Sequence, residues 1–116
     1  MEQAVKIFKA LSDVTRIRMI KLLEKAGELC VCEIVKALDI SQTRASRNLN
    51  ILKHAGLVTD RRIKMWVHYS INRKECEKCC DDMFKVVRLW LNDEPQVKED
   101  LLRLKKFRKT LKKTGK

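Results

Sequence analysis

The sequence contains few residues that interrupt helices and few aromatic residues. Its 116 residues include one proline and three glycines, and 5% of them are aromatic. Because proline and glycine are the residues that most disfavour a helix interior, this composition predicts a mostly helical protein. A chain of this length buries one hydrophobic core, which excludes a second independent core.

Long apolar runs are also absent. No segment approaches the roughly 18 consecutive apolar residues of a transmembrane helix, and residues 1–10 lack the apolar stretch and the cleavage site of a signal peptide. We therefore expect a cytoplasmic protein with no membrane partner. The cysteines number five, and an odd number in that compartment indicates free, metal-binding or redox-active thiols rather than a disulfide scaffold.

Acidic residues are scarce relative to basic ones. There are 15 Asp and Glu against 27 Lys and Arg, for a formal charge of +12, which favours a polyanionic partner such as nucleic acid. Residues 103–116 contain eight basic residues and no acidic one. This run could reach DNA outside a core site, but the interpretation that we favour from composition is a disordered, solubilising end.

Apolar spacing predicts four helices before residue 56, over about 4–11, 14–25, 30–38 and 41–55. Ser12 or Asp13 and Ser41 are suitable N-caps, and Gly27 and Gly56 are suitable stops. Two helices joined by the short turn at 39–41 are typical of a helix-turn-helix. The alternating residues of 57–63 and 65–71 then predict a two-stranded hairpin, which in that place is a wing. The predicted fold is mostly α with a small β-hairpin, a winged helix-turn-helix.

Two further helices are predicted after the hairpin. Asn72 and Glu75 have capping-box spacing and open a long helix to about residue 92, whose seam packs against another helix. Pro95 starts a last helix. We predict a DNA-binding and dimerisation domain at 1–93 and a basic helix or tail at 94–116. The apolar stripes are Cys76, Cys80, Met83, Val87 and Trp90 on the first helix, and Val97, Leu101, Leu104, Phe107 and Leu111 on the second.

The helix after Ser41 carries the candidate DNA-binding residues. Residues near the N-terminus of a recognition helix reach base edges, whereas basic residues around it contact phosphates. Each polar residue alone is more simply a solvated one, but their coincidence on one helix followed by a basic hairpin favours DNA. The candidates are Gln42, Thr43, Ser46 and Arg47 for bases, Asn50 on the same face, and Arg44, Lys53, Arg61, Arg62 and Lys64 for phosphates.

Cys30 and Cys32 open the predicted third helix. Positions two apart on an α-helix differ by about 200°, so the sulfurs are expected on nearly opposite sides. One thiophilic ion could then bind both only if the first turn unwinds. Because this helix supports the recognition helix, such unwinding would release DNA. The alternative, two small apolar side chains that fill a helix start, remains open.

A second group of cysteines lies on the predicted long helix. The spacing of Cys76, Cys79 and Cys80 places three thiols on one face, which suits a three-coordinate soft ion. The same residues could instead pack in the core or a dimer interface, or form half of a zinc site or a redox pair. The sequence shows no acid–base pair or nucleophile arrangement, and we predict no enzymatic activity.

Four stretches of the sequence, within about residues 5–71, resemble the ArsR/SmtB metal-sensing winged-helix repressors of prokaryotes, in particular the arsenical-resistance operon repressors. The resemblance implies a homodimer formed by the first and C-terminal helices, with no obligatory cofactor. It also implies that the dimer leaves its double-stranded DNA operator when As(III) or Sb(III) binds the thiolates of Cys30 and Cys32. The stretches that carry the resemblance are ALSDVTRIRMIKLL, ELCVCEI, SQTRASRNLNILKHAGLV and WVHYSI.

The chain also departs from that family pattern. Where similar repressors often have a third cysteine this chain has Val35, so a third ligand is absent or comes from Cys76, Cys79 or Cys80. The usual glycine of the wing turn is Lys64. Two alternatives are a repressor of the same fold that responds to cadmium, lead or zinc, and a repressor switched by thiol oxidation.

Overall fold

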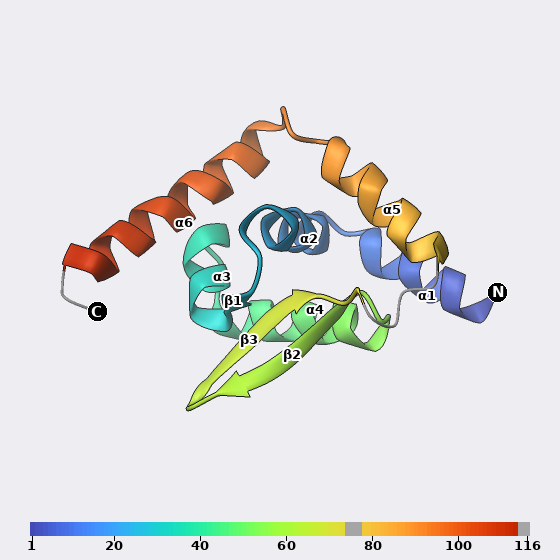
Figure 1. Ribbon diagram of the computed structural model, residues 1–116, viewed down its shortest axis with the longest axis horizontal. Helices are drawn as coiled ribbons and strands as arrows, with labels where there is room; N and C mark the ends of the chain where they lie inside the picture. Colours follow the sequence, from blue (N-terminus) through green and yellow to red (C-terminus); the bar gives the residue numbers. More distant parts are fainter. Residues whose placement is uncertain (74–77, 114–116) are drawn as a thin grey trace.

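The computed structural model describes residues 1–73 and 78–113 (Figure 1). α2 lies at the centre, with α3, α4 and the hairpin below it, α1 and α5 on one side and α6 on the other (Figure 1). The elements are α1 (Glu2–Leu11), α2 (Val14–Ala26), β1 (Leu29–Cys30), α3 (Val31–Leu38), α4 (Gln42–His54), β2 (Val58–Ile63), β3 (Trp66–Ile71), α5 (Lys78–Leu89) and α6 (Pro95–Lys113).

The predicted N-caps of α2 and α4 are confirmed. The carboxylate of Asp13 accepts from the N–H of Arg16, and the hydroxyl of Ser41 accepts from the N–H of Arg44 at 3.1 Å. Both bonds satisfy N–H groups that a helix start leaves without partners. Asp39 ends α3 in the left-handed conformation, with φ of 56°, and thereby turns the chain into α4.

The sheet has three antiparallel strands in the order β1-β3-β2, where the sequence predicts only a hairpin. β2 and β3 form that hairpin, with Ile63 opposite Trp66. Lys64 in its two-residue turn has φ of +59°, a conformation that glycine adopts most easily. The added strand β1 pairs Cys30 with His68. Two residues are too short to show the alternation that identifies a strand in sequence.

The core lies between α2, α3, α4 and the sheet. Its members are large aliphatic side chains with almost no exposure, which supply the main free energy of folding through burial. α1 contributes Ile7 and Ala10, whereas Val5 and Phe8 face outward. The most buried residues of the centre are Met19, Ile20, Leu22, Leu23, Leu29, Ile34, Leu38, Leu49, Leu52, Leu57 and Val58.

Lys21 is a buried cation that links α2 to the end of α5. Its side chain is 1% exposed. The ammonium donates to the carbonyl oxygens of Val87 at 2.9 Å and Trp90 at 2.6 Å, to Asn92 Oδ1 at 2.6 Å and, more weakly, to the Arg88 carbonyl at 3.3 Å. Val87 and Arg88 belong to the last turn of α5 and Trp90 follows it, so the ammonium caps the C-terminal end of α5. Burial lowers the pKa of Lys21 below its ordinary value.

The predicted long helix is observed as Lys78–Leu89, shorter than the expected span to about residue 92. The predicted pairing of Asn72 with Glu75 lies outside the described residues. Asn72 itself is buried and its N–H donates to the Leu57 carbonyl at 3.0 Å. It therefore joins the end of β3 to the turn after α4.

α6 packs against α2 and α3. Arg18 of α2 forms an ion pair with buried Asp100 at 2.8 Å, and Arg103 donates to the Ala37 carbonyl of α3 at 3.1 Å. The predicted last helix from Pro95 is confirmed. The interpretation of the basic run as disordered is wrong for residues 103–113, because the apolar stripe that includes Leu104 gives them a buried face.

Candidate nucleic-acid interface and thiol site

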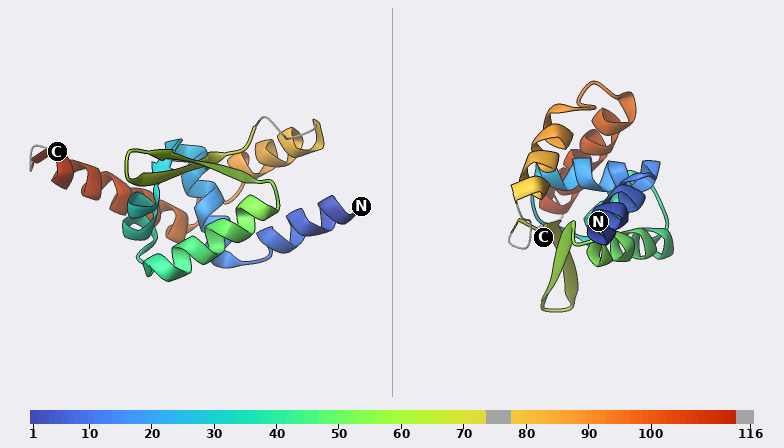
Figure 2. Two further views of the ribbon diagram at one scale, coloured as in Figure 1. Left: turned by 90° about the horizontal axis from the view of Figure 1, so that it is seen from below. Right: turned by 90° about the vertical axis from the view of Figure 1, so that its right-hand side faces the viewer.

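α4 presents one apolar and one polar face. Ala45, Leu49 and Leu52 are fully buried, which fixes the opposite face of the helix toward solvent. The polar side chains of that face can form hydrogen bonds. α4 and the hairpin lie on the same side of the molecule (Figure 2). The exposed residues include all five predicted base-side candidates, Gln42, Thr43, Ser46, Arg47 and Asn50.

A buried polar network that the sequence analysis missed holds α4 in place. Arg16 donates to Asn48 Oδ1 at 2.9 Å and to the Ala10 carbonyl at 2.6 Å, and Asn48 Nδ2 donates to the Arg44 carbonyl at 2.9 Å. These bonds fix α4 against α1 and α2, since a buried amide cannot lose its partners cheaply. A polar residue at position 48, on the apolar stripe of α4, was the sequence feature that could have indicated this network.

The predicted phosphate contacts divide into two groups. Arg62 and Lys64 on the hairpin are exposed, as phosphate contacts must be. Arg44 donates to Thr15 Oγ1 at 2.8 Å, and Lys53 pairs with Asp60 at 3.1 Å. These two side chains are already partnered, although both remain at the surface.

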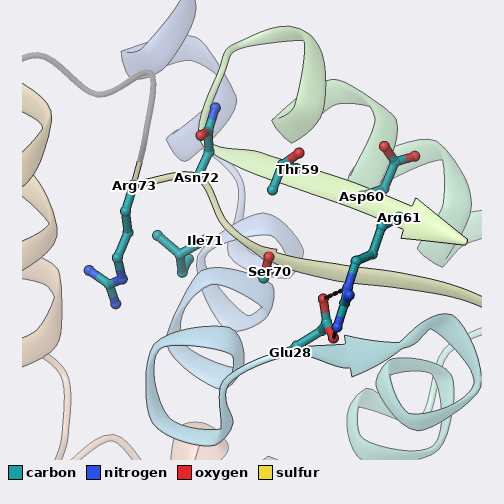
Figure 3. A pocket seen from close by; sticks show the side chains of 8 residues that line it. All are labelled: Glu28, Thr59, Asp60, Arg61, Ser70, Ile71, Asn72 and Arg73. Carbon is teal, nitrogen blue, oxygen red and sulfur yellow. Dashed lines mark hydrogen bonds and ion pairs between the residues drawn. The ribbon is translucent and has the colours of Figure 1, made fainter. Parts of the chain in front are cut away.

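Arg61 is held by Glu28, away from α4 (Figure 3). Its Nε and Nη2 each donate to one carboxylate oxygen at 2.7 Å. The hydrogen bond from Arg61 lowers the pKa of Glu28 below its ordinary value. The contribution of the pair is therefore present above the ordinary pKa of the carboxyl and is lost as the pH falls through the lowered one.

We expect Glu28→Gln to strengthen DNA binding, because it frees the predicted phosphate contact Arg61. Each additional phosphate that the protein neutralises adds about 0.9 to the slope of log affinity against log salt concentration. In the dimer that the sequence analysis predicts, two such contacts should steepen the slope by about 2. Fluorescence anisotropy across a salt series measures it. Asp93→Asn, on the loop between α5 and α6, removes the same charge without freeing Arg61; equal slopes for both variants would contradict a role for Arg61.

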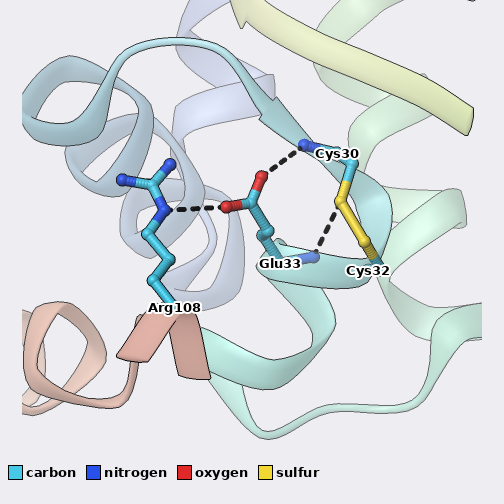
Figure 4. Close-up of a disulfide and its surroundings, with 4 residues drawn as sticks. All are labelled: Cys30, Cys32, Glu33 and Arg108. Atoms are coloured by element: carbon cyan, nitrogen blue, oxygen red, sulfur yellow. Dashed lines mark hydrogen bonds and ion pairs between the residues drawn. A yellow bond between two sulfur atoms is a disulfide. The ribbon is translucent and has the colours of Figure 1, made fainter. Parts of the chain in front are cut away.

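The sulfurs of Cys30 and Cys32 are joined in a disulfide at the start of α3 (Figure 4). Cys30 is the N-cap of α3, with extended φ of −74° and ψ of 158°. Its side chain folds over the first turn, where Cys30 Sγ accepts from the N–H of Glu33 at 3.3 Å. The N–H of Cys30 donates to Glu33 Oε1 at 3.1 Å, which completes a capping box.

This geometry corrects the prediction that the two sulfurs point to opposite sides. That prediction placed Cys30 inside the helix, whereas α3 begins at Val31. Both sulfurs therefore meet with the first turn intact, and unwinding is not required to bring them to one ligand. This disulfide is not a scaffold, because a bond between residues two apart constrains little of the chain. It therefore does not contradict the expectation that the chain has no disulfide scaffold.

Glu33 connects the thiol site to α6. Its second oxygen, Oε2, accepts from Arg108 Nε at 2.8 Å (Figure 4). The capping box of α3 is thus tied to the basic helix, which the sequence analysis did not predict because the two residues are 75 apart.

The other three cysteines lie elsewhere in the sequence, around the start of α5. Cys76 lies outside the described residues, and Cys79 and Cys80 belong to the first turn of α5. α5 and α3 stand on opposite sides of α2 (Figures 1 and 2). Within residues 1–73 and 78–113, no group of three or more His, Cys, Asp or Glu is arranged to hold a metal ion.

Comparison with known proteins decides the family. Residues 13–60 match the model of the bacterial regulatory proteins of the arsR family. An uncharacterized HTH-type transcriptional regulator of Methanocaldococcus jannaschii is 42% identical over 85 residues, which are 71% of this chain and 96% of that protein. The chain belongs to the ArsR family. Because this is a family of regulators, the expectation that the chain is not an enzyme is confirmed.

Two further similar proteins support the assignment to this family. The arsenic resistance transcriptional regulator ArsR1 of Pseudomonas putida is 46% identical over 81 residues, 70% of this chain and 62% of that protein. The chain therefore spans about three fifths of the length of that regulator. A homodimeric winged helix-turn-helix DNA-binding domain from Mycobacterium bovis, a possible ArsR-family regulator, has a TM-score of 0.65 at 32% identity, over 76% of this chain and 77% of that one. The predicted winged helix-turn-helix is confirmed. In the described part of the chain, no helix could cross a membrane.

Proposed function

We propose that the chain is a dimeric repressor that leaves its DNA operator when As(III) or Sb(III) binds the thiolates of Cys30 and Cys32. The observation that carries the proposal is that both sulfurs meet at the first turn of α3, the first helix of the helix-turn-helix. Adjacent sulfurs are the donors that soft, thiophilic ions prefer. The name of the Pseudomonas relative, an arsenic resistance regulator, supports the same inducer class.

Cys30 links the inducer site to the DNA-binding elements. It is the last residue of β1, which pairs with β3 of the hairpin, and it is the N-cap of α3, which packs on α4. An ion held by both thiolates fixes the separation of the two sulfurs. Cys30 must then adjust against β3 or α3, and either adjustment shifts the wing relative to α4.

An apolar surface of α1 and α5 supports the dimer. Phe8 is 66% exposed and Trp90 64% exposed, and both line an apolar groove with Val86. Exposed apolar patches of this kind mark protein interfaces. A second copy of the chain placed there by a two-fold axis would present two α4 helices roughly 34 Å apart, which matches an inverted-repeat operator.

The repressor proposal predicts sequence-specific binding. A duplex selected from random sequence by the reduced protein should contain an inverted repeat and bind at least about 1,000-fold more tightly than a scrambled duplex at physiological salt. Electrophoretic mobility shift in the presence of dithiothreitol measures both affinities. Equal affinity for the two duplexes would contradict the proposal.

A second candidate function is a thiol redox switch, which the Cys30–Cys32 disulfide specifically favours. Peroxide would take two electrons and two protons from the thiols to form the disulfide and two waters. DNA release by peroxide, reversal by dithiothreitol and no effect of arsenite on the reduced protein would select this function. A cadmium, lead or zinc sensor has less support, because the described residues contain no group of three or more His, Cys, Asp or Glu that could hold such an ion.

A further inference from the structure

The outward face of α6 is rich in lysine. Lys105, Lys106 and Lys109 are all exposed, and residues three and four apart share one side of a helix. No ion pair found among residues 1–73 and 78–113 involves these three lysines. Their charge is therefore available to an external partner.

The acidic residues of α6 are already neutralised. Asp100 pairs with Arg18 at 2.8 Å, and Glu99 pairs with Arg103. No acidic residue follows Asp100 in the sequence. The end of α6 thus carries unopposed positive charge along its exposed side, whereas its arginines serve to hold the helix on the body of the protein.

The anchoring of α6 fixes where these lysines lie. The helix starts at the loop on the far side from the hairpin, passes α3 and ends at the level of α4 (Figure 1). Seen from below, its end lies beyond α3, at the opposite end of the molecule from α1 (Figure 2). In a dimer formed through α1 and α5, the two α6 ends would lie at the two outer limits of the assembly, on either side of both α4 helices.

We propose that α6 is an additional DNA-contacting element, in which Lys105, Lys106 and Lys109 hold phosphates of the duplex outside the core operator. The inference rests on the proposed DNA-binding function. Lysines contact phosphates without reading sequence, so α6 would extend the footprint and leave the operator sequence unchanged. A membrane surface fits less well, because the apolar stripe of α6, with Val97 and Leu104 buried, is already covered by the protein.

The test compares two duplexes in the same assay. One ends at the selected core operator, and the other adds about 10 base pairs of random sequence at each end. We expect the wild-type dimer to bind the longer duplex at least about tenfold more tightly at 0.1 M salt, because each added phosphate contact contributes a factor of about 8 at that salt concentration. Lys105→Gln/Lys106→Gln/Lys109→Gln should bind the core duplex like wild type and lose the tenfold gain, with unchanged circular dichroism.

The matched control is Lys25→Gln/Lys85→Gln/Lys98→Gln, which removes the same charge from exposed lysines away from the end of α6. It should keep the tenfold preference for the longer duplex. The inference is overturned if wild type shows no such preference, if the α6 variant retains it, or if both triple variants lose it equally. Failure of the wild type to distinguish the core duplex from scrambled DNA would instead contradict the proposed function.

Discussion

Cys32→Ser is expected to bind the operator within about twofold of wild type and to remain bound at arsenite concentrations at least 100-fold above those that release wild type. Cys32 is on the first turn of α3 and lies outside the core, so its loss should not disturb α4. One remaining thiolate cannot chelate the ion, and chelation supplies most of the affinity for a bidentate ligand site. Anisotropy of labelled operator under arsenite titration measures both quantities.

Cys30→Ser should show the same operator affinity and the same resistance to arsenite, and it should also keep the cap of α3. Serine is a preferred N-cap, so the hydrogen bond from the Glu33 N–H that Cys30 Sγ now accepts can be kept. The matched control is Cys79→Ser/Cys80→Ser on α5. If this double variant resists arsenite while both single variants respond normally, the inducer site lies on α5 and our assignment is wrong.

Lys21→Met is expected to destabilise the protein by about 3 kcal/mol, the largest stability effect that we predict. Methionine keeps the length of the side chain but removes the ammonium. The Trp90 carbonyl and Asn92 Oδ1 then lose this donor, and the Val87 carbonyl keeps the longer bond from the Trp90 N–H at 3.3 Å. Each unsatisfied buried acceptor costs about 1–3 kcal/mol. For a domain of this size the melting temperature should fall by about 10 °C or more.

Lys25→Met, on the exposed side of the same helix, is the control. It should change the free energy of unfolding by no more than about 0.5 kcal/mol. Both variants must be compared at one protein concentration, because the proposed dimerisation would add to apparent stability. A Lys21→Met protein as stable as the control would show that Lys21 does not cap α5.

Sequence patterns that involve only neighbouring residues predicted most of the helices. Asp13 and Ser41 cap α2 and α4 as expected, since an N-cap depends on residues within one turn. The apolar stripe of α4 identified its exposed face for the same reason. The hairpin followed from alternation, which is also a local pattern.

Interactions across long sequence separations were not predictable. Nothing in the sequence distinguishes Lys21 from the other basic residues of its helix, because its hydrogen-bond partners are 66 or more positions away. The pairing of Arg61 with Glu28 likewise depends on the three-stranded sheet, and β1 is too short to recognise. The predicted arrangement of the two sulfurs was wrong because α3 begins one residue later than expected. An N-cap has extended backbone and projects its side chain differently from a helical residue.

That shift changes the expected mechanism. A pair of thiols that required unwinding would couple the inducer to DNA through the loss of α3. The observed pair lies where β1 becomes α3, so the inducer can act by moving the hairpin against α4 while α3 stays folded. Hydrogen exchange of α3 in the arsenite-bound protein distinguishes these two routes.

The most direct test of the account is a titration of reduced wild-type protein, bound to its operator, with arsenite. Operator anisotropy and the ultraviolet absorbance of arsenic–thiolate bonds are followed in the same sample. We predict that both signals change over one concentration range and that Cys30→Ser and Cys32→Ser abolish both. Thiolate absorbance that develops while the operator stays bound, or release that persists in both variants, would contradict the account.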